Sequence, residues 1–179
     1  MTIQEIAMQL WPFWLLGLMM IITVLCSEHR DLLTVKFKGV LYFLRVMILV
    51  SVYRYVIFRF IAPASTLAGA KSMVGFIPWQ ATFGVFWEDA VYVLPLVILA
   101  RLYSDKTWYK YVKWPLLILT MISFGSGHMY QGVLASIGLC FCIPFSKKMG
   151  MKYGFGTVMA CHILYDMITI LTLGWIVGA

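Results

Sequence analysis

Two histidines and three carboxylates stand out in this chain because they lie within long apolar stretches: Glu88, Asp89, His128, His162 and Asp166. An ionisable side chain at the centre of a membrane helix costs about 2.5–3.5 kcal/mol, so it usually faces a polar interior that has a function. In such an interior a carboxylate can take a proton from water, and a histidine can hold or pass that proton. The five residues together therefore predict one polar site within the apolar helices.

The spacing of these residues on their helices refines that prediction. His162 and Asp166 are at i and i+4, so they share a helical face and the carboxylate can orient the imidazole. Glu88 and Asp89 are adjacent, and adjacent residues diverge by about 100° around a helix axis. We therefore expect only one of these two acids to point squarely at the site.

The composition indicates the setting. Of the 179 residues, 63% are hydrophobic and only 12% are charged, and the mean hydropathy is +0.91, which is more apolar surface than a soluble domain needs. A helix crosses the hydrocarbon core with about 20 residues, and the chain divides into six pieces of about that length. We predict an all-α polytopic membrane bundle that forms a single domain over residues 1–179. The predicted spans are Gln4–Cys26, Gly39–Ala62, Ile77–Arg101, Trp114–Gln131, Gly132–Phe145 and Tyr153–Ile176.

Helix geometry places the titratable residues at similar depths. At a rise of 1.5 Å per residue, Glu88 lies about 16 Å from the outer start of its span, and His128 and His162 lie about 21 Å and 14 Å from the cytoplasmic starts of theirs. These depths overlap near the middle of a hydrocarbon core about 30 Å thick. We therefore expect the three helices to meet there.

Lysines and arginines indicate the orientation. Ten of the 14 fall in or beside three alternate connections, Ser27–Lys38, Leu102–Lys113 and Ser146–Lys152. The positive-inside rule then predicts cytoplasmic basic loops, with the N-terminus and the C-terminus outside, in a prokaryotic cytoplasmic membrane. Because the lysines are divided among short loops, the lipid bilayer is an expected partner and nucleic acid is not.

Three short motifs occur in order: the acidic pair Glu88-Asp89, Phe124 to His128, and His162 to Asp166. This set resembles the CAAX-protease and bacteriocin-processing (CPBP) family of intramembrane proteases, which includes the type II CAAX prenyl endopeptidase. The similarity covers residues 75–179, and residues 1–74 are predicted to form two accessory helices. The resemblance implies a glutamic-type endopeptidase without a metal, in which Glu88 and His128 activate water while His162 and Asp166 support the oxyanion.

The chain departs from the family pattern at two positions. The family's first motif is usually E-E-x-x-x-R, whereas Asp89 replaces the second glutamate and Val93 occupies the position of the arginine. Asp89 is therefore a supporting residue that could pair with an arginine of the second span, Arg45 or Arg54. Arg101 is another candidate for the missing arginine. An ionised Asp166 would repel an oxyanion, so we expect it to keep His162 protonated.

Two alternatives stay open beside an endopeptidase that cuts a membrane-associated protein or peptide. Two histidines and two carboxylates could supply three zinc ligands and a water, although H-E-x-x-H and CxxC patterns are absent from the sequence. The other is a non-catalytic scaffold or immunity-type regulator that binds a partner membrane protein. The missing arginine favours the scaffold hypothesis, whereas the presence of Glu88, His128 and His162 favours an enzyme.

Overall fold

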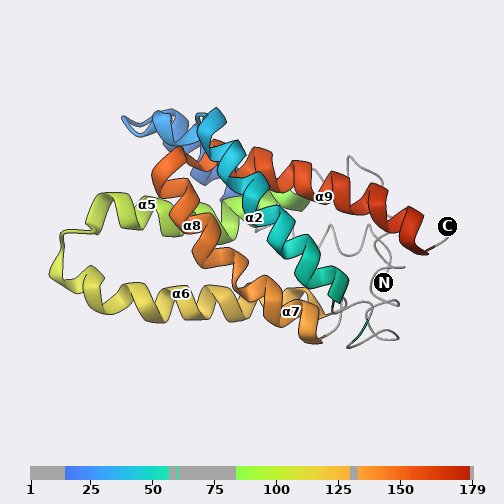
Figure 1. Ribbon diagram of the computed structural model, residues 1–179. Helices are drawn as coiled ribbons and strands as arrows, with labels where there is room; N and C mark the ends of the chain where they lie inside the picture. The colour runs from blue at the N-terminus through green and yellow to red at the C-terminus, as the bar shows by residue number, and fades with distance from the viewer. Residues whose placement is uncertain (1–14, 57–59, 61–83, 130–132, 178–179) are drawn as a thin grey trace.

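The computed structural model describes residues 15–56, 60, 84–129 and 133–177 (Figure 1). Every regular element in these ranges is helical, which confirms the predicted all-α class. No helix within these ranges is both long enough and apolar enough to cross a membrane. The elements are a helix at 15–25, the 3-10 turn η1 (Arg30–Leu33), α2 (Phe37–Val56), a helical segment at 84–88, the π-helical turn η3 (Asp89–Val93), α5 (Leu94–Tyr103), α6 (Thr107–Gly127), α7 (Val133–Cys140), α8 (Cys142–Tyr153) and α9 (Phe155–Val177).

Two predicted loops turn out to be largely helical. The chain reverses within residues 104–106, so most of the predicted loop Leu102–Lys113 belongs to α5 and α6. The predicted loop Ser146–Lys152 lies inside α8. Both loops were inferred from their lysines, but lysine is a good helix former, and its charge alone does not end a helix. The fifth predicted span, Gly132–Phe145, is also wrong as a single helix, because it breaks between α7 and α8.

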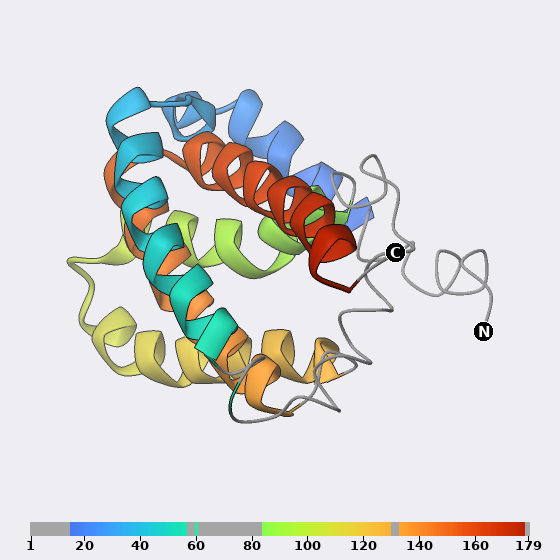
Figure 2. The ribbon, with the colours of Figure 1, turned by 45° about the vertical axis from the view of Figure 1, so that its right-hand side comes forward.

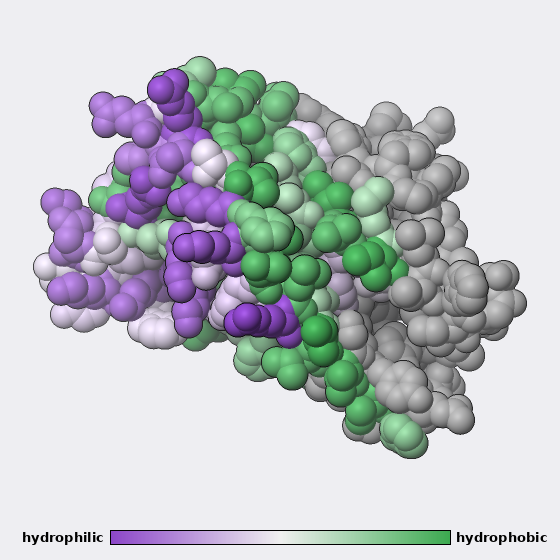
Figure 3. All heavy atoms as spheres, turned by 45° about the horizontal axis from the view of Figure 1, so that its top comes forward, coloured by the Kyte–Doolittle hydropathy of each residue, from purple (hydrophilic) through white to green (hydrophobic). Residues whose placement is uncertain are grey.

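The three predicted basic connections lie at one end of the molecule (Figures 1 and 2). They are the segment between the 15–25 helix and α2, the turn between α5 and α6, and the junction between α8 and α9. At that last junction Gly154 has φ +95°, a conformation that side chains with a Cβ rarely adopt. Figure 3 shows hydrophilic residues gathered at this end, with hydrophobic residues covering the neighbouring surface. We call this region the basic end.

The connection before α2 is fixed to the first turn of α9. The backbone N–H of Lys36 donates to the hydroxyl of Thr157 at 2.8 Å, and that hydroxyl donates to the carbonyl of Tyr153 at 2.8 Å. Gly156 packs directly on backbone, since a Cβ there would lie 2.6 Å from the carbonyl carbon of Leu33. Because α9 carries His162 less than two turns further on, these contacts position that histidine.

The helix formed by residues 84–103 lies at the centre of the packing. Val93, Leu94 and Val97 are almost fully buried, and the chain approaches Gly150 of α8 so closely that a Cβ there would lie 2.7 Å from Val97 Cγ2. Contacts also join this helix to α6 and η3 to α9. Side chains at its N-terminal half therefore face α9, which carries His162, and the end of α6, which is followed by His128.

Candidate functional site

Glu88 and Asp89 lie where the central helix changes from α-helical to π-helical geometry. Glu88 is the last residue before the π turn, and Asp89 is its first. The Glu88 side chain is 33% exposed, whereas that of Asp89 is only 3% exposed. Single π turns are rare and are found frequently at functional sites. The turn therefore marks the point at which two adjacent carboxylates differ in environment.

Glu88 pairs with His128 across the contact between the central helix and α6. Glu88 Oε1 and His128 Nε2 are 3.4 Å apart. His128 follows the last residue of α6, and its backbone N–H donates to the carbonyl of Gly125 at 3.0 Å. Its ring packs against Phe124, with centroids 4.5 Å apart. The helix end thus holds the imidazole against the carboxylate.

The hydrogen bonds of His128 define where its protons lie. Nδ1 is 2.7 Å from the carbonyl oxygen of Phe124, and a carbonyl only accepts, so Nδ1 carries a proton. In the neutral ring Nε2 would then be an acceptor facing a carboxylate oxygen, which is repulsive. The contact is favourable when a proton lies either on Nε2 or on Glu88, so a proton can pass between these two groups.

Asp89 pairs with His162 of α9. His162 Nδ1 donates to Asp89 Oδ1 at 3.1 Å, which leaves Nε2 directed elsewhere. The other carboxylate oxygen, Oδ2, is buried and has no hydrogen-bond partner among the described residues. A buried carboxylate that holds Nδ1–H fixes the orientation and tautomer of an imidazole. Nε2 of His162 is therefore the nitrogen available for chemistry.

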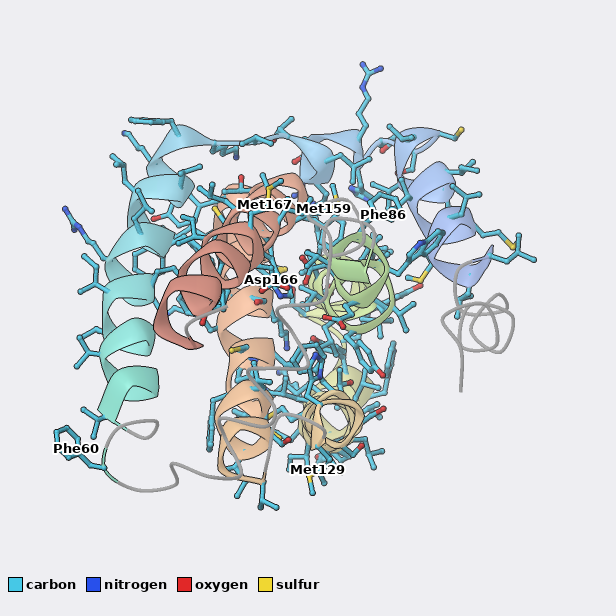
Figure 4. The ribbon with its side chains drawn as sticks, turned by 90° about the vertical axis from the view of Figure 1, so that its right-hand side faces the viewer. Phe60, Phe86, Met129, Met159, Asp166 and Met167 are labelled. Atoms are coloured by element: carbon cyan, nitrogen blue, oxygen red, sulfur yellow. The ribbon has the colours of Figure 1, made fainter. Side chains whose placement is uncertain are left out.

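The expectation that only one of the two adjacent acids reaches the site is wrong. Glu88 and Asp89 each engage a histidine, on two different helices. The two side chains point in different directions from the helix axis, and each still meets a histidine because α6 and α9 lie on different sides of the central helix (Figures 1 and 4). The three helices do meet, as predicted, and the contacts involve two sides of the central helix, one facing His128 and the other facing His162.

Asp166 takes part less directly than its spacing predicts. Its Oδ1 is 4.0 Å from His162 Nε2, which is too long for a hydrogen bond, and its side chain is 25% exposed. Figure 4 shows Asp166 between α9 and the central helix. The closer carboxylate is Asp89, so the ring of His162 has one acid bonded to Nδ1 and a second acid facing Nε2.

The two acid–histidine pairs lie close enough to influence each other. Glu88 and Asp89 are adjacent on the central helix, so the histidines that they contact, at 3.4 Å and 3.1 Å, are brought to the same part of that helix. The four residues therefore form one cluster rather than two separate ion pairs. We call this group, Glu88, Asp89, His128 and His162, the acid–histidine cluster.

None of the arginines with a described side chain replaces the one missing from the motif. Arg101 forms a salt bridge with Asp31, with 2.8 Å between Nη2 and Oδ2, at the basic end. Arg45 is exposed on α2, so it does not pair with Asp89. The side chain of Arg54 lies outside the described residues. Val93 itself is 1% exposed and belongs to the hydrophobic core.

Tyr92 is a neighbour of the cluster that the sequence analysis missed. Its ring lies 5.4 Å from that of Phe124, which packs on His128, and Ser123 Oγ donates to its hydroxyl at 3.5 Å. The signal was present, because Tyr92 follows Glu88 at i+4 and therefore lies on the same side of the helix. The contact orients Phe124 against His128.

Within the part of the chain that the structure describes, no three histidine, cysteine, aspartate or glutamate residues are grouped so as to hold a metal ion. The expected metal-free site stays a prediction. Comparisons with protein-family models, with curated proteins and with solved structures found no match. The resemblance to the CPBP family therefore depends on the three motifs alone.

Proposed function

We propose that this protein is an intramembrane endopeptidase that hydrolyses a peptide bond in a membrane-associated protein or peptide. The observation that carries the proposal is the acid–histidine cluster, in which a partly exposed glutamate lies 3.4 Å from one histidine, beside a second histidine that is held by a buried aspartate. This combination offers a base, a proton carrier and a hydrogen-bond donor within one site.

In the proposed reaction, Glu88 takes a proton from a water molecule whose oxygen forms a bond to the substrate carbonyl carbon. His162 Nε2–H donates a hydrogen bond to the resulting oxyanion, and the negative charges of Asp89 and Asp166 suit a protonated ring. At the start the proton of the Glu88–His128 pair lies on His128 Nε2, so Glu88 is ionised and able to act as the base. The C–N bond then breaks, and Glu88 returns the proton that it took from water to the leaving nitrogen, while protonated His128 holds the carboxylate in place. Every proton is accounted for without an additional cofactor.

A membrane setting is supported by the surface of the helices. Large apolar side chains are exposed along α2 and α6, where water would be an unfavourable solvent for so large a surface. Examples include Ile48, Leu49 and Val52 on α2 and Ile118, Leu119 and Ile122 on α6. The gathering of the three basic connections at one end supports the orientation expected from the positive-inside rule, with that end in the cytoplasm.

The test compares membranes from cells that express the intact protein and the Glu88→Gln variant, using mass spectrometry of co-expressed membrane peptides. New peptide ends should appear with the intact protein and be lost with Glu88→Gln, because the amide cannot take a proton from water. Glu28→Gln is the matched control, since Glu28 lies in the connection before η1 and should process normally. Equal processing by Glu88→Gln would remove Glu88 from its role.

A non-catalytic scaffold is the second candidate, and it is favoured by the core valine at position 93 where the family has an arginine. It predicts that no peptide is processed by either form and that a partner membrane protein co-purifies equally with intact protein and Glu88→Gln. A zinc enzyme would instead lose activity with a chelator and regain it with zinc. The metal-free proposal predicts insensitivity to the chelator.

A further inference from the structure

Exposed aromatic rings and lysines share the first two turns of α6. Trp108, Tyr111 and Trp114 are 47%, 76% and 60% exposed, although each is large enough to bury well in a core. Lys110 and Lys113 lie between them, and Lys113 Nζ lies 5.5 Å from the centroid of the Trp114 ring. We call residues 107–114 the aromatic–lysine segment.

The surroundings of this segment are strongly basic. The basic end holds ten lysines and arginines against three acidic residues, Glu28, Asp31 and Asp105. Two of those acids are already engaged, Asp31 by Arg101 at 2.8 Å and Asp105 by Lys106 at 3.8 Å. Lys147 of α8 lies over Tyr109 at 5.9 Å, and burial lowers the pKa of this lysine. Within the described ranges, the positive charge of the basic end therefore exceeds the negative charge of its acidic residues.

We propose that the aromatic–lysine segment binds anionic phospholipid headgroups, with Lys110 and Lys113 on phosphates and the rings of Trp108 and Trp114 at headgroup level. Tryptophan and tyrosine favour the boundary between lipid and water, and lysines near a membrane surface are attracted to anionic lipids. Exposed apolar residues continue along α6 at Ile118 and Leu119, as expected if the helix passes from headgroups towards acyl chains.

The lysines alone would attract either an anionic lipid surface or a soluble acidic protein. The indole rings between them favour the lipid surface, because tryptophan side chains prefer the headgroup layer. The inference is independent of peptide hydrolysis. It concerns a different surface from the acid–histidine cluster and holds whether or not Glu88 is catalytic.

The test uses the full-length protein in a neutral detergent, titrated with short-chain phosphatidylglycerol or with the matching phosphatidylcholine. Phosphatidylglycerol should change the tryptophan fluorescence and raise the thermal midpoint, with an effect that weakens as salt is added, and phosphatidylcholine should do neither. Equal responses to the two lipids would overturn the proposal. So would displacement of phosphatidylglycerol by polyglutamate at equal charge with the same fluorescence change, which would indicate an acidic protein partner.

The variants separate this segment from general positive charge. Lys110→Gln with Lys113→Gln should weaken phosphatidylglycerol binding about 30-fold, since each lysine near an anionic surface contributes about fivefold. Arg45→Gln is the matched control, because Arg45 is exposed in the middle of α2, and it should leave binding unchanged. Should the double variant fail to fold, Trp108→Phe combined with Trp114→Phe, with all lysines kept, should remove most of the fluorescence change. An unaltered change would contradict the placement of these two rings at headgroup level.

Discussion

Replacing Asp89 by asparagine isolates the contribution of the buried carboxylate that holds His162. Asp89 is 3% exposed, and its Oδ1 lies 3.1 Å from His162 Nδ1. Breaking a buried charge pair by removing one partner destabilises a protein by about 3–5 kcal/mol. The asparagine carbonyl can still accept one neutral hydrogen bond worth about 1 kcal/mol. We therefore expect a loss of about 3 kcal/mol, or roughly 6–12 °C in thermal midpoint for a chain of this size.

The assay is thermal unfolding of the purified protein in a neutral detergent, with a double-mutant cycle that combines Asp89→Asn and His162→Gln. The double variant should be more stable than the sum of the single losses predicts, with a coupling of about 2 kcal/mol. Asp105→Asn is the matched control, because its side chain is 75% exposed, and its effect should stay within about 0.5 kcal/mol. Strict additivity, or an Asp89→Asn loss no larger than that of Asp105→Asn, would refute the reasoning.

Two further predictions concern the elements that position the cluster. Gly156→Ala should lower the thermal midpoint by several degrees, because the added Cβ meets the backbone of Leu33 and overpacking costs about 1–3 kcal/mol. Gly127→Ala is the control: a Cβ there meets no described atom within 4 Å, so this variant should be neutral or slightly stabilising in the same thermal unfolding assay. If Gly127→Ala were the more damaging of the two, the close approach of α9 to η1 would be contradicted. Arg101→Gln should change the midpoint by no more than about 4 °C, since its salt bridge with Asp31 is half-exposed and such pairs contribute at most about 1 kcal/mol. A loss as large as that of Asp89→Asn would show that the basic end depends on this pair.

The helical class and the residues of the site could be predicted from the sequence. Apolar segments separated by charged connections indicated helices, and estimates of depth along each helix placed Glu88, His128 and His162 at one level. The ends of α5, α6 and α8 could not be predicted, because lysines mark where a helix meets a polar environment and say nothing about where its hydrogen bonding stops.

The pairing within the site was beyond the sequence. The i and i+4 spacing pointed to Asp166 as the partner of His162, because a spacing pattern can only relate residues that lie on the same helix. The closer partner, Asp89, comes from the central helix, and its approach depends on how α9 packs against η3. The role of the Phe124 carbonyl, which determines the tautomer of His128, likewise appears only once α6 ends at Gly127.

The measurement that tests the central claim most directly is the rate of peptide cleavage by Glu88→Gln, by His162→Gln and by the variant that carries both. If the acid–histidine cluster acts as one site, each single change should lower the rate by about 100-fold or more, and the double variant should be little slower than either. Losses that multiply in the double variant would show that the two residues act independently, and unchanged rates in either single variant would contradict the account.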